Sequence, residues 1–321
     1  MTIPTLDASL VAMDMRDFKV FRELIHRETG IWLRDGKQVM LAARLAKRLR
    51  HHGMSNFADY AAYVETVQDG GKELAEIINC VTTNKTSFFR EIHHFNFLAQ
   101  TLVPQLVAGA QLGRARNIRI WSAACSTGEE PYSIAITLLD ALKVAHGPGL
   151  LAPSQGQPLS LPGGWQVEVI ASDIDTVVLA TAARGIYDQE SLDEVPPAMQ
   201  TRYFLRGKGD MTGQVRVKKE VAQLVKFQRL NLMDDVWTID GLFDVIFFRN
   251  ALIYFNRATQ ELFLRKMLRY LKPRGHLVLG HSEHVPWLSD SLEPLNNTIH
   301  QLRAQKRAPY TGVERRRRPR P

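Results

Sequence analysis

Two adjacent carboxylates, Glu129 and Glu130, directly follow a turn of small residues in the stretch from Ile118 to Leu142. The stretch begins with alternating branched apolar residues, which is typical of a buried strand. After Gly128, apolar residues recur at four-residue steps, which predicts one buried face of a helix. We therefore expect a strand, a tight turn and a helix, and open α/β sheets bind cofactors over such a turn.

The chemistry of this turn follows from its glycine content and its charge. It holds one glycine, so it is not the G-x-G-x-x-G fingerprint of dinucleotide-binding proteins. Two carboxylates would repel a pyrophosphate. They suit S-adenosylmethionine, which carries a sulfonium, an ammonium and a ribose but no phosphate. The alternative is that Glu129 and Glu130 only favour the positive N-terminus of the helix.

An aspartate, Asp173, ends a second predicted strand that starts at Val167. An acid in this position can accept hydrogen bonds from ribose hydroxyls, although it usually lies only about 20 residues after the turn. An irregular insertion rich in glycine and proline, Gly147 to Gly164, accounts for the longer separation and is predicted to be a surface loop. The alternative is that the acids of Asp173-Ile174-Asp175 cap the next helix.

A polar run from Thr82 to Glu91 contains two aromatic residues followed by Arg90. It stands where a helical N-terminal part is expected to meet the α/β part. Clefts between domains are favoured ligand sites, so the run is a candidate for binding. The alternative is a capped linker, because threonine and serine are ordinary helix caps.

Helical periodicity dominates the chain before this run. One predicted helix ends at Gly30, a second spans about Lys37 to His52, and Ser55 is expected to cap a third. The second helix carries a basic face formed by Arg44, Lys47, Arg48 and Arg50. This face is either a solvated surface or a docking surface for an acidic helix.

The rest of the chain alternates strands and helices. Further strands are predicted at 224–228, 243–248 and 276–280, with an additional edge strand at 298–303. This alternation implies a mainly parallel sheet that is covered on both faces. Short alternating segments at 203–206 and 214–218 predict a hairpin in a small inserted lobe. Its basic residues either hold an acidic peptide along a strand edge or protect that edge from aggregation.

Composition restricts the function classes. The chain has 321 residues and a net charge of +8, which suits two domains and an acidic partner. Cys80 and Cys125 lie far apart and the histidines form no metal-spaced set. We therefore expect no metal and a reducing, cytoplasmic environment. No apolar run is long enough to cross a membrane, and Met1 to Leu10 show no secretory signal.

A set of ordered motifs points to one family. The motifs are Thr83–Glu91, Trp121–Ser133, Ala171–Asp175, Phe248–Phe255, Leu271–Pro273 and Gly280–Glu283. With them the chain resembles, from about Phe18 to Ala304, the bacterial chemotaxis receptor methyltransferases, which are protein-glutamate O-methyltransferases of the CheR type.

The resemblance implies an α/β, Rossmann-like sheet of the S-adenosylmethionine-dependent methyltransferases. It adds an N-terminal all-helical domain and a small inserted antiparallel β-subdomain. The expected divisions are residues 1–90, residues 91–305 with the insertion at about 188–223, and a basic tail, 306–321, expected to be disordered.

The resemblance also implies the site residues. Binding of S-adenosylmethionine is expected of Asn84, Thr86, Arg90, Glu130, Asp173, Asn231, Leu232, Arg249 and Asn250. Arg90 and Tyr254 are expected near the reacting groups, where they orient the carboxylate or the cofactor. The family pattern favours Glu130 over Glu129 as the partner of the ammonium, a choice that the turn by itself leaves open.

Chemotaxis receptors are the implied partners. The helix with Arg44, Lys47, Arg48 and Arg50 is expected to dock on the receptor's methylation helices, and the inserted lobe to bind a C-terminal receptor tail. These contacts would recruit the protein to membrane receptor arrays. The alternatives are a non-catalytic module that senses S-adenosylmethionine and a nucleic-acid methyltransferase. The latter is disfavoured because Arg249-Asn250-Ala251-Leu252 lacks the proline pair of amino-methylating enzymes.

Overall fold

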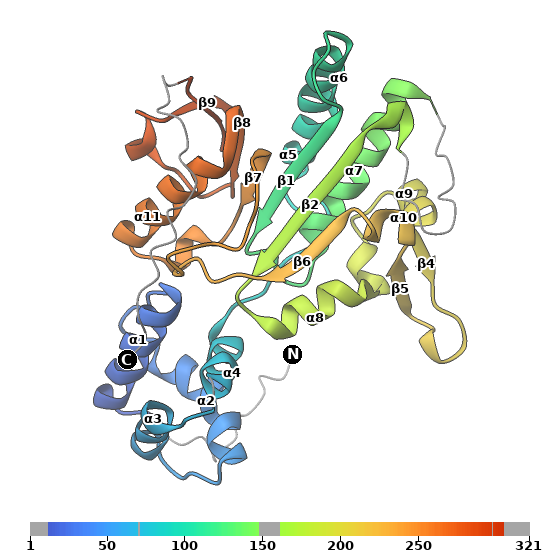
Figure 1. Cartoon of the computed structure of the whole chain (residues 1–321). Coiled ribbons are helices and arrows are strands. Elements are labelled where there is room, and N and C mark those ends of the chain that lie inside the picture. Colours follow the sequence, from blue (N-terminus) through green and yellow to red (C-terminus); the bar gives the residue numbers. More distant parts are fainter. Residues whose placement is uncertain (1–11, 70, 148–160, 297, 305–321) are drawn as a thin grey trace.

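The computed structural model describes residues 12–69, 71–147, 161–296 and 298–304, which form a helical part and a larger α/β part (Figure 1). Most of the predicted insertion loop, residues 148–160, and the predicted basic tail lie outside these described residues. Within the described ranges, no helix has the length and apolar character needed to cross a membrane.

The helical part consists of α1 (Met15–Thr29), α2 (Gln38–His51), α3 (Phe57–Thr66) and α4 (Lys72–Val81). As predicted, α1 ends at Gly30, whose left-handed φ of 76° lets its N–H reach the His26 carbonyl at 2.8 Å. The prediction that Ser55 caps α3 is wrong, because Asn56 accepts the hydrogen bond from the Asp59 N–H at 2.8 Å. Serine and asparagine are equally good N-caps, so the sequence alone does not decide which of the two adjacent residues caps the helix.

An ion pair between α2 and α4 removes one residue from the predicted basic face of α2. The Arg48 side chain is 13% exposed and pairs with Glu73, which is 4% exposed. Glu73 also accepts a hydrogen bond from the Tyr60 hydroxyl at 2.5 Å and lies 2.9 Å from His52 Nε2. Arg48 is thus turned inward, unlike the solvent-facing position that the sequence predicts, because the periodicity of one helix does not reveal an acid on another.

A seven-stranded sheet forms the α/β part, in the order β6-β2-β1-β7-β8-β10-β9. Its strands are β1 (Asn117–Ala123), β2 (Gln166–Asp173), β6 (Val225–Arg229), β7 (Phe243–Phe248), β8 (Leu271–Leu279), β9 (Leu292–Asn296) and β10 (Ile299–Leu302). The strands from β6 to β8 pair in parallel, and β10 and β9 are antiparallel. The predicted strand at 298–303 is therefore present but not at the edge. The edge is β9, which holds Pro294, a residue that sheets tolerate at their edges.

Helices cover both faces of this sheet, as predicted (Figure 1). On one face lie α5 (His93–Phe97), a π-helical turn (Leu98–Leu102), α6 (Val103–Gln111) and α7 (Glu129–His146), packed on Ile118 and Ile120. On the other face, α11 (Arg257–Met267) packs in a core with Trp121. Ile118 and Ile120 of β1 pack in the first core, and Trp121 and Ala123 pack in the second, so the strand is buried on both faces. The helix α8 (Thr176–Arg184) packs beside β2 and β6.

The inserted lobe is a three-stranded antiparallel sheet in the order β3-β5-β4. It consists of β3 (Ile186–Asp188), β4 (Phe204–Arg206) and β5 (Gln214–Val217), with the short helices α9 (Pro197–Tyr203) and α10 (Lys219–Ala222). The predicted hairpin is confirmed as β4 and β5. The third strand, β3, begins just before the expected start of the insertion and was too short to be found from alternation.

The Glu73 cluster makes the stability of the protein depend on acid. Burial raises the pKa of Glu73, but hydrogen bonds from Arg48, Tyr60 and His52 outweigh this and lower it from 4.5 to about 2. Because the pKa is lower in the folded state, the stabilisation is complete above about pH 4.5 and is lost as the pH falls toward 2.

We therefore expect urea-unfolding free energies of the wild type to fall more steeply with acidification below about pH 4.5 than those of Glu73→Gln. Glu65→Gln, which changes an exposed acid on α3, is the matched control and should follow the wild type within about 0.5 kcal/mol. Equal acid slopes for wild type and Glu73→Gln would contradict the prediction.

Candidate functional site

A cavity of about 480 Å³ lies between the helical part and the carboxyl ends of β1, β2 and β7. A smaller cavity of about 60 Å³ adjoins it and shares Ala124 and Asp173 in its wall. Together the two are lined by every residue predicted to bind a cofactor, namely Asn84, Thr86, Arg90, Glu130, Asp173, Asn231, Leu232, Arg249 and Asn250. Tyr254 also lines the larger cavity. The fold thus brings together residues that are far apart in the sequence.

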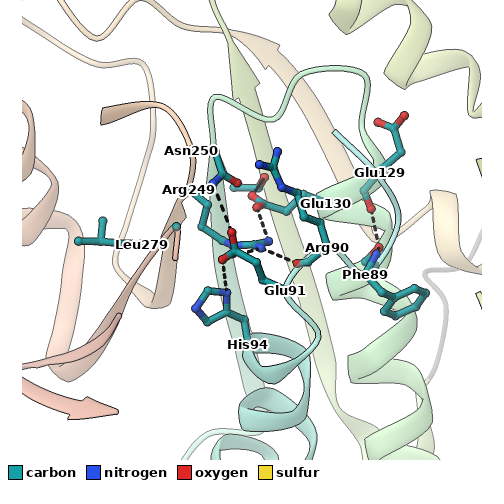
Figure 2. A network of polar contacts seen from close by, with 12 residues as sticks. Phe89, Arg90, Glu91, His94, Glu129, Glu130, Arg249, Asn250 and Leu279 are labelled. Atoms are coloured by element: carbon teal, nitrogen blue, oxygen red, sulfur yellow. Dashed lines mark hydrogen bonds and ion pairs between the residues drawn. The ribbon is translucent and has the colours of Figure 1, made fainter. Parts of the chain in front are cut away.

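The two carboxylates after the β1 turn have different surroundings. Glu130 lines the larger cavity, accepts a hydrogen bond from Ser122 Oγ at 2.7 Å and pairs with Arg249 Nη1 at 3.0 Å. Glu129 accepts a hydrogen bond from Thr127 Oγ1 at 2.7 Å and lies apart from this group (Figure 2). Burial raises the pKa of Glu130, and the Arg249 guanidinium opposes that rise. Of the two, Glu130 is the carboxylate that faces the cavity.

Arg249 is the buried centre of a polar cluster (Figure 2). Its side chain is 2% exposed and lies between two carboxylates, Glu130 and Glu91, the latter at 3.2 Å from Nη2. It also donates to the backbone carbonyl of Arg90. Burial raises the pKa of Glu91, but the charge of Arg249 and hydrogen bonds bring it below its ordinary value. Glu91 was quoted in a family motif, but the sequence analysis gave it no role, because its partner lies on a distant strand.

Asn250 follows Arg249 in a strained turn at the end of β7. Its φ is 58°, a left-handed value that few non-glycine residues adopt and that asparagine tolerates better than most. Glu283 holds the turn, accepting hydrogen bonds from the N–H groups of Asn250 (2.9 Å), Leu252 (2.8 Å) and Gly280 (2.7 Å). A Cβ on Gly280 would lie 2.5 Å from Asn250 Nδ2, so the turn requires glycine there. Sequence reasoning assigned Glu283 no role.

Asp173 and Asp175 divide the two roles that the sequence left open. Asp173 accepts hydrogen bonds from the N–H groups of Ser126 at 2.8 Å and Asp175 at 3.0 Å, and it lines both cavities. The side chain of Asp175 caps α8. The capping alternative therefore holds for Asp175, and Asp173 faces the cavity. Burial raises the pKa of Asp173, while the backbone N–H groups oppose that rise.

The remaining predicted residues lie on loops around the cavity. Asn84 donates to Asp175 Oδ2 at 2.9 Å, and Arg90 Nη1 donates to the Lys85 carbonyl at 3.0 Å. Asn231 lines the smaller cavity, but its carboxamide donates to the Glu28 carbonyl at 2.6 Å and accepts from a backbone N–H. Asn231 thereby connects the end of α1 to the loop after β6.

Several basic side chains line the larger cavity without an acidic partner within the described residues. They are Arg34, Lys37, Arg44, Lys85 and Arg90. Arg44 is the one predicted docking residue among them, and its guanidinium donates to carbonyls at the end of α4. Lys47 and Arg50 are exposed on α2 outside the cavity wall. The lining of the cavity therefore combines the acids Glu130 and Asp173 with several cations.

Two other reactive groups near the site have local roles. Cys125 is 1% exposed, and burial raises its pKa well above the ordinary value, which fits the predicted buried filler and opposes thiolate chemistry. In the part of the chain that the structure describes, Glu91, His93 and His94 form the one group of potential metal ligands. The Arg249 guanidinium already pairs with Glu91, so a positive charge occupies that position.

Comparisons with known proteins agree with this geometry. The model of the CheR methyltransferase all-alpha domain matches residues 16–82, and that of the CheR methyltransferase SAM binding domain matches residues 84–153 and 157–300. The chain belongs to the CheR methyltransferase family. It is a chemotaxis methyltransferase that uses S-adenosylmethionine, which confirms the predicted family, fold class and cofactor.

Relatives in this family match over nearly their full length. Chemotaxis protein methyltransferase 2 of Pseudomonas aeruginosa is 41% identical over 284 residues, which is 88% of this chain and 92% of the relative. The chemotaxis protein methyltransferase of Escherichia coli is 41% identical over 292 residues, or 91% of this chain and 92% of the relative. That of Salmonella typhimurium is 41% identical over 92% of this chain and 93% of its own length.

S-adenosylmethionine fits the donor set of this CheR cavity. Each oxygen of Asp173 accepts one N–H, and because a carboxylate has about four acceptor positions, capacity remains for ribose hydroxyls. Glu130 supplies a second carboxylate for a cationic group. The volume of about 480 Å³ lies within the usual range of small-molecule sites, about 300–1,000 Å³.

Arg249→Gln is expected to destabilise the folded protein by about 3–5 kcal/mol, because it leaves Glu130 and Glu91 buried without their cation. Urea denaturation followed by circular dichroism measures the loss. Arg269→Gln removes an exposed arginine of the same domain and should cost no more than about 0.5 kcal/mol. Equal losses for the two variants would show that the buried cluster is not held by this charge.

Proposed function

We propose that this CheR protein transfers the methyl group of S-adenosylmethionine to glutamate side chains of chemotaxis receptors, forming methyl esters. The observation that carries the proposal is the charge arrangement of the cavity. Asp173, which is buried, and Glu130, whose side chain is 12% exposed, are acids suited to the hydroxyls and ammonium of the cofactor. Lys85, Arg90 and other unpaired cations on the walls suit an anionic acceptor. A carboxylate acceptor and a positively charged donor both find complementary charge here.

Each cavity residue has a proposed task. Asp173 accepts hydrogen bonds from the ribose, and Glu130, held by Arg249, pairs with the ammonium. Asn231 and Leu232 in the smaller cavity hold the adenine. The remaining residues of the proposed binding set all line the larger cavity; they are Asn84, Thr86, Arg90, Arg249 and Asn250.

The chemistry needs no general base from the chain. A glutamate side chain has a reference pKa of about 4.3, so the acceptor is ionised at neutral pH. Bound S-adenosylmethionine supplies a methyl group already activated by its sulfonium. The chain contributes orientation and exclusion of water, and orientation of this kind supplies about 7–11 kcal/mol. We assign the orientation of the carboxylate or of the cofactor to Arg90 and Tyr254, neither of which acts as a nucleophile.

The α2 surface is the proposed docking site for the receptor's methylation helices. Lys47 and Arg50 are exposed there, and Arg44 lies between this surface and the cavity. Basic residues of this kind attract an acidic helix and raise the rate of encounter. Since Arg48 is used inside the domain, we propose that docking depends on the other three. Docking would recruit the protein from the cytoplasm to receptor arrays.

The three-stranded lobe is the proposed site for a receptor tail. β4 lies at an edge of this sheet, and Leu205 on it is 53% exposed. An extended peptide can add a strand to such an edge. Arg206 and Arg216 place positive charge on the paired strands, which suits an acidic tail. We also place the domain boundary near residue 90 and the tail-binding insertion at about 188–223.

Labelled methyl groups from S-adenosylmethionine are expected to appear on receptor-containing membranes and to be released by base as methanol. Asp173→Ala is expected to raise the KM for the cofactor by about tenfold, the equivalent of one charge-assisted hydrogen bond.

A receptor that lacks its last residues is expected to be methylated more slowly. Base-stable label on nucleic acid, or cofactor binding without turnover on any receptor, would reject the proposed reaction.

Lys47→Glu with Arg50→Glu is expected to raise the KM for the receptor by about tenfold or more, because the docking surface changes sign. The KM for S-adenosylmethionine should stay at the wild-type value. Arg114→Glu with Arg116→Glu makes the same charge change at two exposed residues after α6 and serves as the control. A receptor KM that the α2 double variant leaves unchanged would place docking elsewhere on the protein.

A further inference from the structure

Asp175 joins the helical part to the cofactor site although it lines neither cavity. It is 1% exposed, and its two carboxylate oxygens have separate tasks. Oδ1 caps α8 by accepting from the N–H groups of Val177 at 2.9 Å and Val178 at 3.1 Å. Oδ2 accepts from Thr82 Oγ1 at 2.5 Å and from Asn84 Nδ2 at 2.9 Å. One oxygen therefore serves its own helix and the other serves a distant segment.

That distant segment is the connection from the helical part to the α/β part. Thr82 is the C-cap of α4, and Asn84 follows it into the cavity wall. On its other side, the Asp175 N–H donates to Asp173 Oδ1 at 3.0 Å. Asp175 is thus bonded to two residues to which we assign the cofactor, one on each side of the cavity. Ser126 also bridges the two residues, because its Oγ donates to the Asn84 carbonyl at 3.1 Å and its N–H donates to Asp173 Oδ2 at 2.8 Å. The Asp175 side chain adds the contact that fixes the Asn84 carboxamide.

A second contact between α4 and α8 lies nearby but does not reach the cavity. Asn79 Oδ1 accepts from the Thr176 N–H at 3.1 Å, and Asn79 Nδ2 donates to Thr176 Oγ1 at 3.1 Å. Neither residue lines a cavity. Between α4 or its cap and α8 or its cap, one contact therefore ends at a cofactor-site residue and the other only joins the two helices. Comparing the Asp175 contact with the Asn79–Thr176 contact distinguishes a residue that positions the site from one that only holds α4 against α8.

We propose that Asp175 is a positioning residue that sets Asn84 against Asp173 and thereby makes cofactor affinity depend on how the helical part is seated. The proposal rests on the proposed function, which assigns the cofactor to Asn84 and Asp173. It extends that function, because the same helical part carries the surface to which we assign the receptor. Binding at that surface and binding of the cofactor would then be coupled through one carboxylate.

Asp175→Asn tests the proposal because it divides the two tasks of the side chain. Asparagine is as good a helix cap as aspartate, so Oδ1 can still accept from the first turn of α8. With the oxygen kept at the cap, the new amide group lies against Asn84 Nδ2 and cannot accept from it, whereas the Thr82 hydroxyl can turn and accept from the amide. We expect the Kd for S-adenosylhomocysteine, measured by calorimetry on the full chain, to rise about five- to tenfold. Asn79→Ala is expected to leave this Kd within about twofold of the wild type.

A double-variant cycle distinguishes positioning from a general loss of structure. If Asp175 acts through Asn84, then Asp175→Asn added to Asn84→Ala changes the Kd by no more than about twofold. A full additional loss in that background, or an equal loss in Asn79→Ala, would overturn the proposal. Thr82→Val, which removes one donor and keeps the shape, should give a smaller loss in the same direction.

The same measurements separate this proposal from the proposed function. If Asn84→Ala binds S-adenosylhomocysteine as the wild type does, the assignment of Asn84 to the cofactor fails, and the coupling fails with it. If Asn84→Ala weakens binding and Asp175→Asn does not, the coupling fails alone. Wild-type protein that binds S-adenosylhomocysteine but methylates no receptor would reject the proposed reaction and leave the coupling supported by the Kd values.

Discussion

The buried guanidinium of Arg249 is the interaction on which the site depends. It lies between Glu130, at the start of α7, and Glu91, at the start of the segment that leads into α5. A carboxylate buried alone would be protonated or would destabilise the fold, because burial disfavours its charged form. Arg249 favours the charged form of both acids, because it lowers the pKa of Glu91 and opposes the rise that burial causes in the pKa of Glu130. It also joins the end of β7 to the two segments that close the cavity, so electrostatics and backbone geometry are fixed together.

The backbone around this cluster is held in conformations that need such support. Phe89, Glu91, Ala124, Ser126 and Asn250 all have left-handed φ values, and all lie at the turns that bound the cavity. Each such conformation has a cost of order 1–3 kcal/mol and persists where surrounding contacts fix it. Carboxylates hold two of these turns, because Asp173 accepts from the Ser126 N–H and Glu283 accepts from the Asn250 N–H, while the Phe89 N–H donates to Ser133 Oγ. Acids at the site therefore hold the backbone turns in place, and Asp173 in addition lines the cavity.

Local signals in the sequence were enough for most elements and for the cavity residues that end strands. The strand, turn and helix around Gly128 and the acid at Asp173 follow from periodicity and from the rule for strand ends. The local sequence around a residue does not reveal which side chain from a distant segment will contact it. Arg48 looked exposed because its acid, Glu73, is on another helix, and Glu91 and Glu283 had no role because Arg249 and Asn250 are far away in sequence. β9 was missed because Pro294 interrupts its pattern.

The helical part lines the cavity in addition to carrying the proposed docking surface. Arg44 belongs to both. It projects from α2, yet its guanidinium donates to the Thr82 carbonyl at 3.2 Å and to Thr83 Oγ1 at 2.9 Å. The last carbonyls of a helix lack partners within the helix, so a cation there stabilises the end of α4 and the start of the connecting segment. An acidic helix that approached Arg44 would compete with those carbonyls for its charge. Because the same segment leads to Asn84, an anion bound at Arg44 would also change the electrostatics of the cavity wall.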